Sequence, residues 1–258
     1  MPEHIRYEAQ DGIVTITFAR PSRLNAFDFA MGEPYRDACL AAVGAQDTRA
    51  ILIHAEGPAF CAGGDVLAMA AAGVAGSDVA AGAHVIHEGI ASLVESAIPV
   101  VVAAHGAVAG GGIGLMLAAD VVIAGEDLRV AGKYAEIGLT PDLGVSTLLA
   151  QAVGHRRALE ILLTPRALDA ATALDWGLVA EVSSEPLKRA QQVAASWAEG
   201  ASEAFGQAKR LVRAAGTRSF SDALADEAAS IGRAYDTEES RGRVAAFAAA
   251  SAARAGLR

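Results

Sequence analysis

The stretch HGAVAGGGIGLMLAAD, residues 105–120, carries a glycine triplet between the apolar run VVVAA at 100–104 and an apolar helical pattern. Glycine has no Cβ, so a ligand can approach such a loop closely and meet free backbone N–H groups. Those groups can bind a negatively charged oxygen. The alternative interpretation is that Gly110, Gly111 and Gly112 only allow tight packing of the helix that follows.

A second loop of this kind lies earlier in the chain. The stretch AEGPAFCAGGD, residues 55–65, follows a buried strand predicted at 50–54, and helical spacing resumes at about 78–96. Apolar residues among the glycines predict a structured turn rather than a flexible one. Two strand–glycine loop–helix units in one chain predict an α/β fold with two sets of exposed backbone N–H groups.

Turn residues and periodicity predict the remaining elements. Asp11-Gly12 separates two alternating runs, which is the pattern of a tight β-hairpin. A helix is expected at about 29–43, and a loop at 138–142 should open another helix near Leu143. From residue 185 onward the pattern is almost purely helical, with segments at 185–198, 201–215, 219–234 and 237–254.

The composition limits the classes of protein to which the chain can belong. The 258 residues are 53% hydrophobic and carry a net charge of −9, which excludes a protein that follows nucleic-acid backbones. Surplus apolar surface indicates oligomerisation. No basic segment precedes an apolar one and no run of about 18 apolar residues occurs, so we expect a cytoplasmic protein without membrane contact. Cys39 and Cys61 are expected to be free thiols.

Known phosphate-binding and metal-binding motifs do not fit. The glycines at 110, 112 and 114 lack the spacing of a dinucleotide fingerprint, and no Gly-Lys-Ser/Thr ending marks a Walker loop. Histidines, cysteines and carboxylates show no metal-ligand spacing. We therefore expect no metal and no cofactor other than one carried by the substrate.

Several segments together resemble the crotonase (enoyl-CoA hydratase/isomerase) family. The resemblance covers ARPSRLNAFD at 19–28, the two glycine loops, EIGLTPDLGVSTLL at 136–149 and the helical tail. It implies a spiral of ββα units with two roughly perpendicular sheets over residues 1–195. Residues 196–258 would form a C-terminal helical trimerisation region, giving a homotrimer or a dimer of trimers.

The same resemblance implies where an acyl-CoA substrate binds. The N–H groups of Gly64 and Gly111 would hold the thioester carbonyl oxygen as an oxyanion hole. Residues beside them in the first loop would line the substrate site: Ala62, Asp65 and Val66. Three more residues would approach CoA: Arg23 at its nucleotide end, and Lys209 and Phe247 in the trimerisation region, from the same or a neighbouring subunit. A solvated lysine and a core phenylalanine are the alternatives for the last two.

The two glutamates of typical hydratases in this family are missing, since their positions hold Gly114 and Tyr134. Asp142 is the remaining candidate acid and base, although an aspartate before a helix can simply cap it. Tyr134 would either orient Asp142 or only pack. A single carboxylate beside a polarised thioester favours a proton shuttle. The expected enzyme is an enoyl-CoA isomerase, similar to the 1,2-epoxyphenylacetyl-CoA isomerases.

His87 leaves two alternatives open. Its place resembles that of the histidine base in 4-chlorobenzoyl-CoA dehalogenases, so Asp142 and His87 could together serve a hydratase or a dehalogenase-like hydrolase. Otherwise His87 is a helix-face residue without a chemical role. A third possibility is a catalytically inactive CoA-binding homologue, because both typical glutamates are absent.

Overall fold

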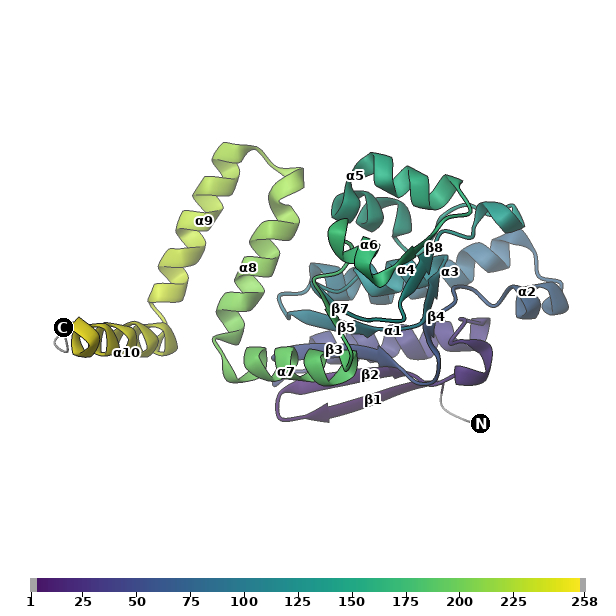
Figure 1. Cartoon of the computed structure of the whole chain (residues 1–258). Helices are drawn as coiled ribbons and strands as arrows, with labels where there is room; N and C mark the ends of the chain where they lie inside the picture. Colours follow the sequence, from purple (N-terminus) through teal and green to yellow (C-terminus); the bar gives the residue numbers. More distant parts are fainter. Residues whose placement is uncertain (1–3, 256–258) are drawn as a thin grey trace.

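Two β-sheets form the centre of the molecule, and a computed structural model describes residues 4–255 (Figure 1). The larger sheet has the order β1-β2-β3-β5-β7-β10 and the smaller has the order β4-β6-β8-β9. The strands of the larger sheet are β1 (Ile5–Gln10), β2 (Ile13–Phe18), β3 (Ala50–Ala55), β5 (Val100–Ala104), β7 (Val121–Gly125) and β10 (Glu181–Ser183). Those of the smaller sheet are β4 (Ala59–Cys61), β6 (Ala107–Ala109), β8 (Arg129–Ala131) and β9 (Ala167–Asp169).

The chain opens with the hairpin predicted at Asp11-Gly12. Strands β1 and β2 pair antiparallel, with Gln10 opposite Ile13. Both turn residues lie in the left-handed region, with φ of 52° and 77°, as a two-residue hairpin turn of this type requires. From β2 onward, the neighbouring strands of this sheet are parallel.

A repeated unit then builds both sheets. Strands β3, β5 and β7 each leave the larger sheet by a short turn and continue as β4, β6 and β8 of the smaller sheet. A helix follows each pair, which confirms the α/β class and the ββα spiral. The helices of this part are α1 (Phe29–Gly44), α2 (Val66–Ala72), α3 (Gly76–Glu95), α4 (Gly111–Leu117), α5 (Val145–Leu163), α6 (Ala170–Asp175) and α7 (Pro186–Glu199), with 3₁₀ turns η1 (Pro21–Arg23) and η2 (Ala135–Ile137).

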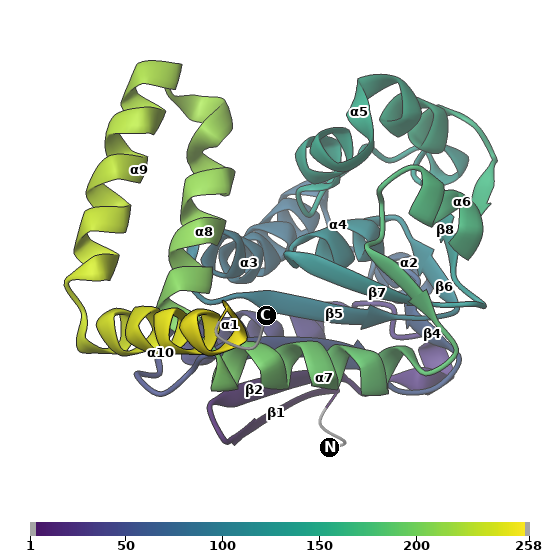
Figure 2. The same ribbon diagram turned by 60° about the vertical axis from the view of Figure 1, so that its left-hand side comes forward.

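Both faces of the larger sheet are covered. One face packs on the main core between the sheets and α1, α3, α4 and α5. The other face is covered by α7, which lies across β3, β5 and β7 (Figure 2). Ala190 and Ala194 of α7 are fully buried there against Leu52 and Val101. This burial on two sides explains why β5 is apolar throughout and β3 is apolar except for His54 near its end.

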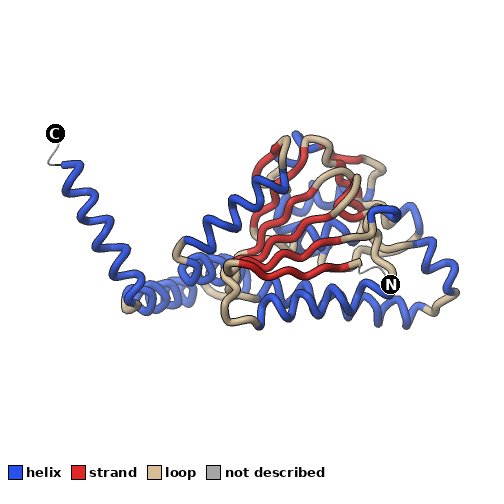
Figure 3. The backbone as a smooth tube through the Cα atoms, turned by 90° about the horizontal axis from the view of Figure 1, so that it is seen from below, coloured by secondary structure: helices blue, strands red, loops and turns tan. Residues whose placement is uncertain are grey.

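Three further helices extend from one side of the sheets (Figure 3). They are α8 (Ser202–Ala214), α9 (Phe220–Tyr235) and α10 (Glu238–Ala255), with η3 (Ala215–Thr217) after α8. The boundary predicted at 195/196 lies inside α7, and the next break between helices is Gly200–Ala201. These helices carry exposed apolar side chains: Phe220, Ile231 and Phe247 are 79%, 72% and 75% exposed. Such a surface is what a trimer would cover, and the trimer stays a prediction. Within residues 4–255, no helix is long and apolar enough to cross a bilayer.

Candidate active site

The first glycine loop joins β4 to α2 and touches the second loop directly. Gly63 has φ of 95°, and a Cβ on it would lie 2.8 Å from the Ala109 carbonyl oxygen and 3.4 Å from the Gly111 nitrogen. Only glycine fits so close an approach. Phe27 flanks the loop, since its N–H donates to the Gly63 oxygen and its oxygen accepts from the Asp65 N–H, both at 2.8 Å.

The second loop turns at Gly110, whose φ of 51° is also left-handed, and α4 begins at Gly111. A Cβ on Gly112 would lie 2.3 Å from the Cys61 oxygen, so this position again requires glycine. Among the described residues, neither the Gly64 N–H nor the Gly111 N–H donates a hydrogen bond to the chain. Both amides that were expected to form the oxyanion hole are therefore free to bind a ligand.

Cys61 lies at the start of the first loop without chemical reactivity. Its sulfur accepts a hydrogen bond from the Gly63 N–H at 3.4 Å. Burial raises the pKa of the Cys61 thiol to about 12, so the residue stays protonated and is a poor nucleophile. Cys39 is also buried and unpaired, which confirms the expectation of two free thiols.

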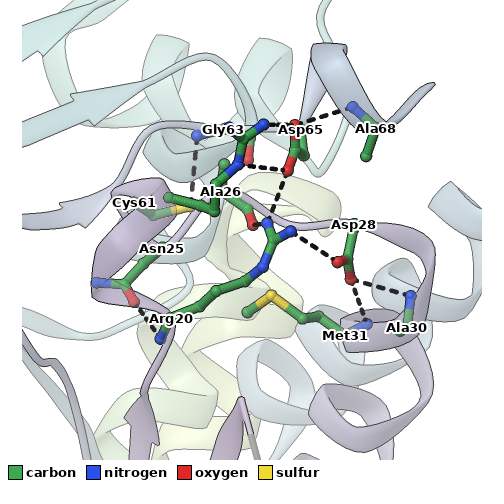
Figure 4. Close-up of polar contacts among 11 residues, drawn as sticks. Arg20, Asn25, Ala26, Asp28, Ala30, Met31, Cys61, Gly63, Asp65 and Ala68 are labelled. Carbon is green, nitrogen blue, oxygen red and sulfur yellow. Dashed lines mark hydrogen bonds and ion pairs between the residues drawn. The ribbon is translucent and has the colours of Figure 1, made fainter. Parts of the chain in front are cut away.

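A buried carboxylate holds the first loop in place (Figure 4). Asp65 is only 3% exposed and accepts hydrogen bonds from Arg23 and Arg20 at 2.8 Å and from the Ala68 N–H at 3.0 Å. These bonds, with that from Arg23 the strongest influence, hold the pKa of Asp65 below its ordinary value. Asp65 caps α2 and directly follows Gly64, so its contacts fix the end of the loop that carries this amide.

Arg20 was not recognised from the sequence as a site residue. Its guanidinium bonds to Asp65, to the Ala26 carbonyl at 2.7 Å and to Asp28 at 3.0 Å. Asp28 in turn caps α1 through the N–H groups of Ala30 and Met31. Arg20 thus joins the N-termini of two helices, a link between residues 20, 28 and 65 that only the folded chain reveals (Figure 4).

The remaining first-loop residues face the same region. Val66 is the first residue of α2 and is 41% exposed, and Leu67 beside it is 68% exposed. Ala62 is half-buried. The Cε of Met69 lies 3.0 Å from where a Cβ on Gly64 would be, so an apolar side chain lies beside this free amide.

Asp142 lies beside the second loop. Its Oδ1 is 3.4 Å from where a Cβ on Gly111 would be. The Tyr134 hydroxyl donates to the same Oδ1 at 2.7 Å and accepts from the Asp142 N–H at 3.3 Å. Burial and the neighbouring Asp142 charge raise the pKa of the Tyr134 phenol, so it remains a donor. These hydrogen bonds are the contacts expected if Tyr134 orients Asp142, a role that stays a prediction.

The interpretation of Asp142 as a helix cap is wrong. The N-cap of α5 is Gly144, and no side chain caps this helix. Leu143 and Gly144 have φ of 49° and 76°, so the chain makes a tight left-handed turn between Asp142 and Val145. This turn separates the carboxylate from the N–H groups of the helix.

The first glutamate of the typical hydratases that the chain resembles would stand at Gly114. No side chain fits at this position. A Cβ on Gly114 would lie 1.9 Å from the Leu143 carbonyl oxygen. The position of the second glutamate holds Tyr134, which is buried at 8% exposure. Asp142, with Oδ1 3.4 Å from the Cβ position of Gly111, is thus the carboxylate that remains beside the second loop once both glutamate positions are empty of one.

His87 reaches the same turn from α3. It is half-buried, and its Nε2 accepts a hydrogen bond from the Leu143 N–H at 3.0 Å. His84, one helical turn earlier, is exposed and has its ring centroid 5.9 Å from that of His87. His87 is therefore more than a solvated residue on a helix face, since it contacts the turn that carries Asp142.

Comparison with known proteins agrees with this geometry. The family model described as "Enoyl-CoA hydratase/isomerase" matches residues 8–252. The chain belongs to the enoyl-CoA hydratase/isomerase family. It is 34% identical over 254 residues to a "Probable enoyl-CoA hydratase" of Rhodobacter capsulatus, covering 94% of each chain. It is 31% identical over 232 residues to the "1,2-epoxyphenylacetyl-CoA isomerase" of Escherichia coli, covering 87% of each.

Solved structures of the enoyl-CoA hydratase/isomerase family show the same fold. The chain is similar to an enoyl-CoA hydratase from Polaromonas sp. JS666, with a TM-score of 0.87 and 29% identity. The similarity covers 95% of this chain and 96% of the other. The spiral of ββα units expected from the resemblance is therefore the fold of the family.

The three residues expected to contact CoA lie apart. Arg23 is bonded to Asp65 and its side chain is 40% exposed, so it retains a surface towards solvent. The Lys209 ammonium is buried, bound to the Leu93 and Ile98 carbonyls at 2.7 Å and paired with Asp120 at 3.0 Å. These contacts attach α8 to the end of α3.

Phe247 belongs to α10, outside the part of the chain that carries the glycine loops (Figure 1). Its side chain is exposed. A contact between Phe247 and CoA stays a prediction, and it would be made across a subunit boundary as expected from the resemblance.

Proposed function

We propose that this chain is an enoyl-CoA isomerase, which moves a carbon–carbon double bond in an acyl-CoA thioester. The observation that carries the proposal is the position of the Asp142 carboxylate beside the free amide of Gly111. A base next to an oxyanion donor can remove a proton from the carbon beside the thioester carbonyl. The similarity to a relative named 1,2-epoxyphenylacetyl-CoA isomerase supports this choice within the family.

The reaction needs one carboxylate that acts twice. Asp142 takes a proton from the second carbon of a 3-enoyl thioester, and the electron pair moves onto the carbonyl oxygen as a dienolate. The N–H groups of Gly64 and Gly111 stabilise that oxygen, and a preformed donor of this kind contributes about 10²–10³ in rate. The protonated Asp142 then returns the proton to the fourth carbon, which leaves the double bond conjugated with the thioester.

Hydration is less well supported by the geometry. Efficient addition of water uses one group to activate the water and another to deliver a proton. The space beyond Gly114 is filled by the Leu143 carbonyl, and Tyr134 replaces the other glutamate. A shuttle by Asp142 requires neither of these missing groups.

The test compares wild type with Asp142→Asn and a matched control, Glu136→Gln. Glu136 is an exposed carboxylate in η2, paired with Lys133, and lies outside the proposed machinery. With a 3-enoyl-CoA, formation of the conjugated thioester is followed by its ultraviolet absorbance. We expect Asp142→Asn to lose about 10²–10⁴-fold in kcat and Glu136→Gln to match wild type.

Three outcomes would contradict the isomerase. An Asp142→Asn protein with the wild-type rate would remove Asp142 from the chemistry. Incorporation of solvent oxygen into the product by wild type would indicate a hydratase or hydrolase. Tight CoA binding without turnover of any enoyl thioester would indicate an inactive CoA-binding homologue.

A further inference from the structure

The turn that carries Asp142 adopts an unusual backbone conformation. Leu143 and the following Gly144 both lie in the left-handed region. Glycine adopts this conformation freely, but for leucine the Cβ approaches the carbonyl oxygen too closely. Such a residue persists only where its surroundings determine its conformation. The contacts of Leu143 therefore decide where Asp142 points.

Three contacts hold Leu143. Its side chain is 4% exposed and its Cδ1 lies 2.6 Å from where a Cβ on Gly111 would be. Its carbonyl oxygen fills the space above Gly114. Its N–H, which a left-handed turn directs away from the helix, donates to Nε2 of His87. The first two contacts are packing contacts, whereas the third is a hydrogen bond and therefore directional.

We propose that His87 is a positioning residue, which acts as a neutral acceptor for the Leu143 N–H and so holds Asp142 beside Gly111. This inference rests on the proposed role of Asp142. An Nε2 that accepts a hydrogen bond carries a lone pair, so the ring proton is on Nδ1. The lone pair of Nε2 is thereby occupied and does not activate a water molecule as a base.

The contact requires a neutral imidazole. A protonated imidazole has donors at both nitrogens and no acceptor, so it would face the Leu143 N–H as a second donor. The ring of His84 lies on the same helix, and the turn that His87 contacts carries Asp142 with its partner Tyr134. Glu88, the next residue of α3, faces Arg36 of α1 at 3.9 Å.

The mutational test uses one variant that keeps an acceptor and one that does not. His87→Gln presents an amide oxygen near the place of Nε2 and does not titrate, while His87→Leu has no polar atom. We expect His87→Leu to lower kcat about 10²-fold, the cost of a displacement of about 1 Å in a positioned group, with little change in KM. His87→Gln should keep most of the activity, because its amide oxygen can accept the Leu143 N–H in place of Nε2.

His84→Gln is the matched control, because His84 lies on the same helix and makes no contact with the turn among the hydrogen bonds of residues 4–255. It should retain the wild-type kcat and KM. If His87→Gln were as inactive as His87→Leu, His87 would transfer a proton and the positioning role would be overturned. Full activity in His87→Leu would overturn it as well.

A spectroscopic readout separates this inference from the proposed function. In ¹⁵N-histidine-labelled wild-type protein, the His87 signals should show an unprotonated Nε2 and a protonated Nδ1 at neutral pH. The opposite tautomer would overturn the inference whether or not any variant folds. If the expected tautomer is seen but wild type does not isomerise enoyl thioesters, the proposed function fails and the contact to Leu143 stands.

Discussion

Gly114→Ala tests the position of the Asp142 turn with a single methyl group. The new Cβ would lie 1.9 Å from the Leu143 oxygen, whereas real Cβ atoms essentially never come within 3.0 Å of another heavy atom. The carbonyl must therefore move by the difference between 3.0 Å and 1.9 Å, which is 1.1 Å. Every residue of α4 is buried, whereas Pro141 and Asp142 just before Leu143 are exposed, so we expect the turn to move rather than the helix.

The size of the effect follows from this displacement. Asp142 precedes Leu143 directly, so its carboxylate shifts by a similar distance away from Gly111. A misplacement of about 1 Å costs about 10²-fold in rate, and an extra methyl group in a packed site costs about 1–3 kcal/mol of stability. We expect Gly114→Ala to lose both activity and stability. The loss of activity should appear mainly as a lower kcat rather than a higher KM.

The assay is the conversion of a 3-enoyl-CoA to its conjugated isomer, with thermal unfolding measured on the same samples. Gly232→Ala is the control, because Gly232 lies in α9 and no atom lies within 4 Å of its Cβ position. That variant should be stabilised by about 1 kcal/mol through helix propensity and keep the wild-type kcat. A Gly114→Ala protein with wild-type kcat and Tm would refute the placement of Leu143 against α4.

Two further predictions concern the residues that hold the loops and helices in place. Asp65→Asn should be less stable than wild type at neutral pH, because a carboxyl whose folded pKa is depressed adds stability above its unfolded pKa of about 3.9. The difference in unfolding free energy between wild type and Asp65→Asn should shrink as pH falls below about 4. Urea unfolding that shows the same difference at every pH would contradict the reasoning. Lys209→Met should lose about 3–5 kcal/mol, the cost of breaking a buried ion pair, with KM for acyl-CoA unchanged at low temperature. A raised KM would instead support the contact with CoA.

Features that depend on local chemistry were predictable from the sequence. The Asp11-Gly12 hairpin has the predicted turn, and the four C-terminal helices α7 to α10 begin and end within one residue of the predicted bounds. Glycines at 63 and 110 to 112 marked both loops because close approach and left-handed backbone leave no room for another residue. Each of these signals lies within a few residues of the element it specifies.

Features that depend on distant contacts were not predictable. The short helix α2 has no buried residue, so it leaves no apolar periodicity to detect, and the sequence analysis missed it. The left-handed Leu143 is set by His87 and Gly114, which lie far away in sequence, and this is why Asp142 was open to interpretation as a cap. The role of Arg20 depends on Asp28 and Asp65 meeting in space.

The contact of Gly63 with Ala109 and Gly111 has a consequence for protein engineering and for divergence among relatives. Each loop packs against the other, so the two sequences constrain one another although about 45 residues separate them. A chimaera that takes only one loop from a relative should lose the register between them. A chimaera that takes both loops from the same relative should keep the contact between them.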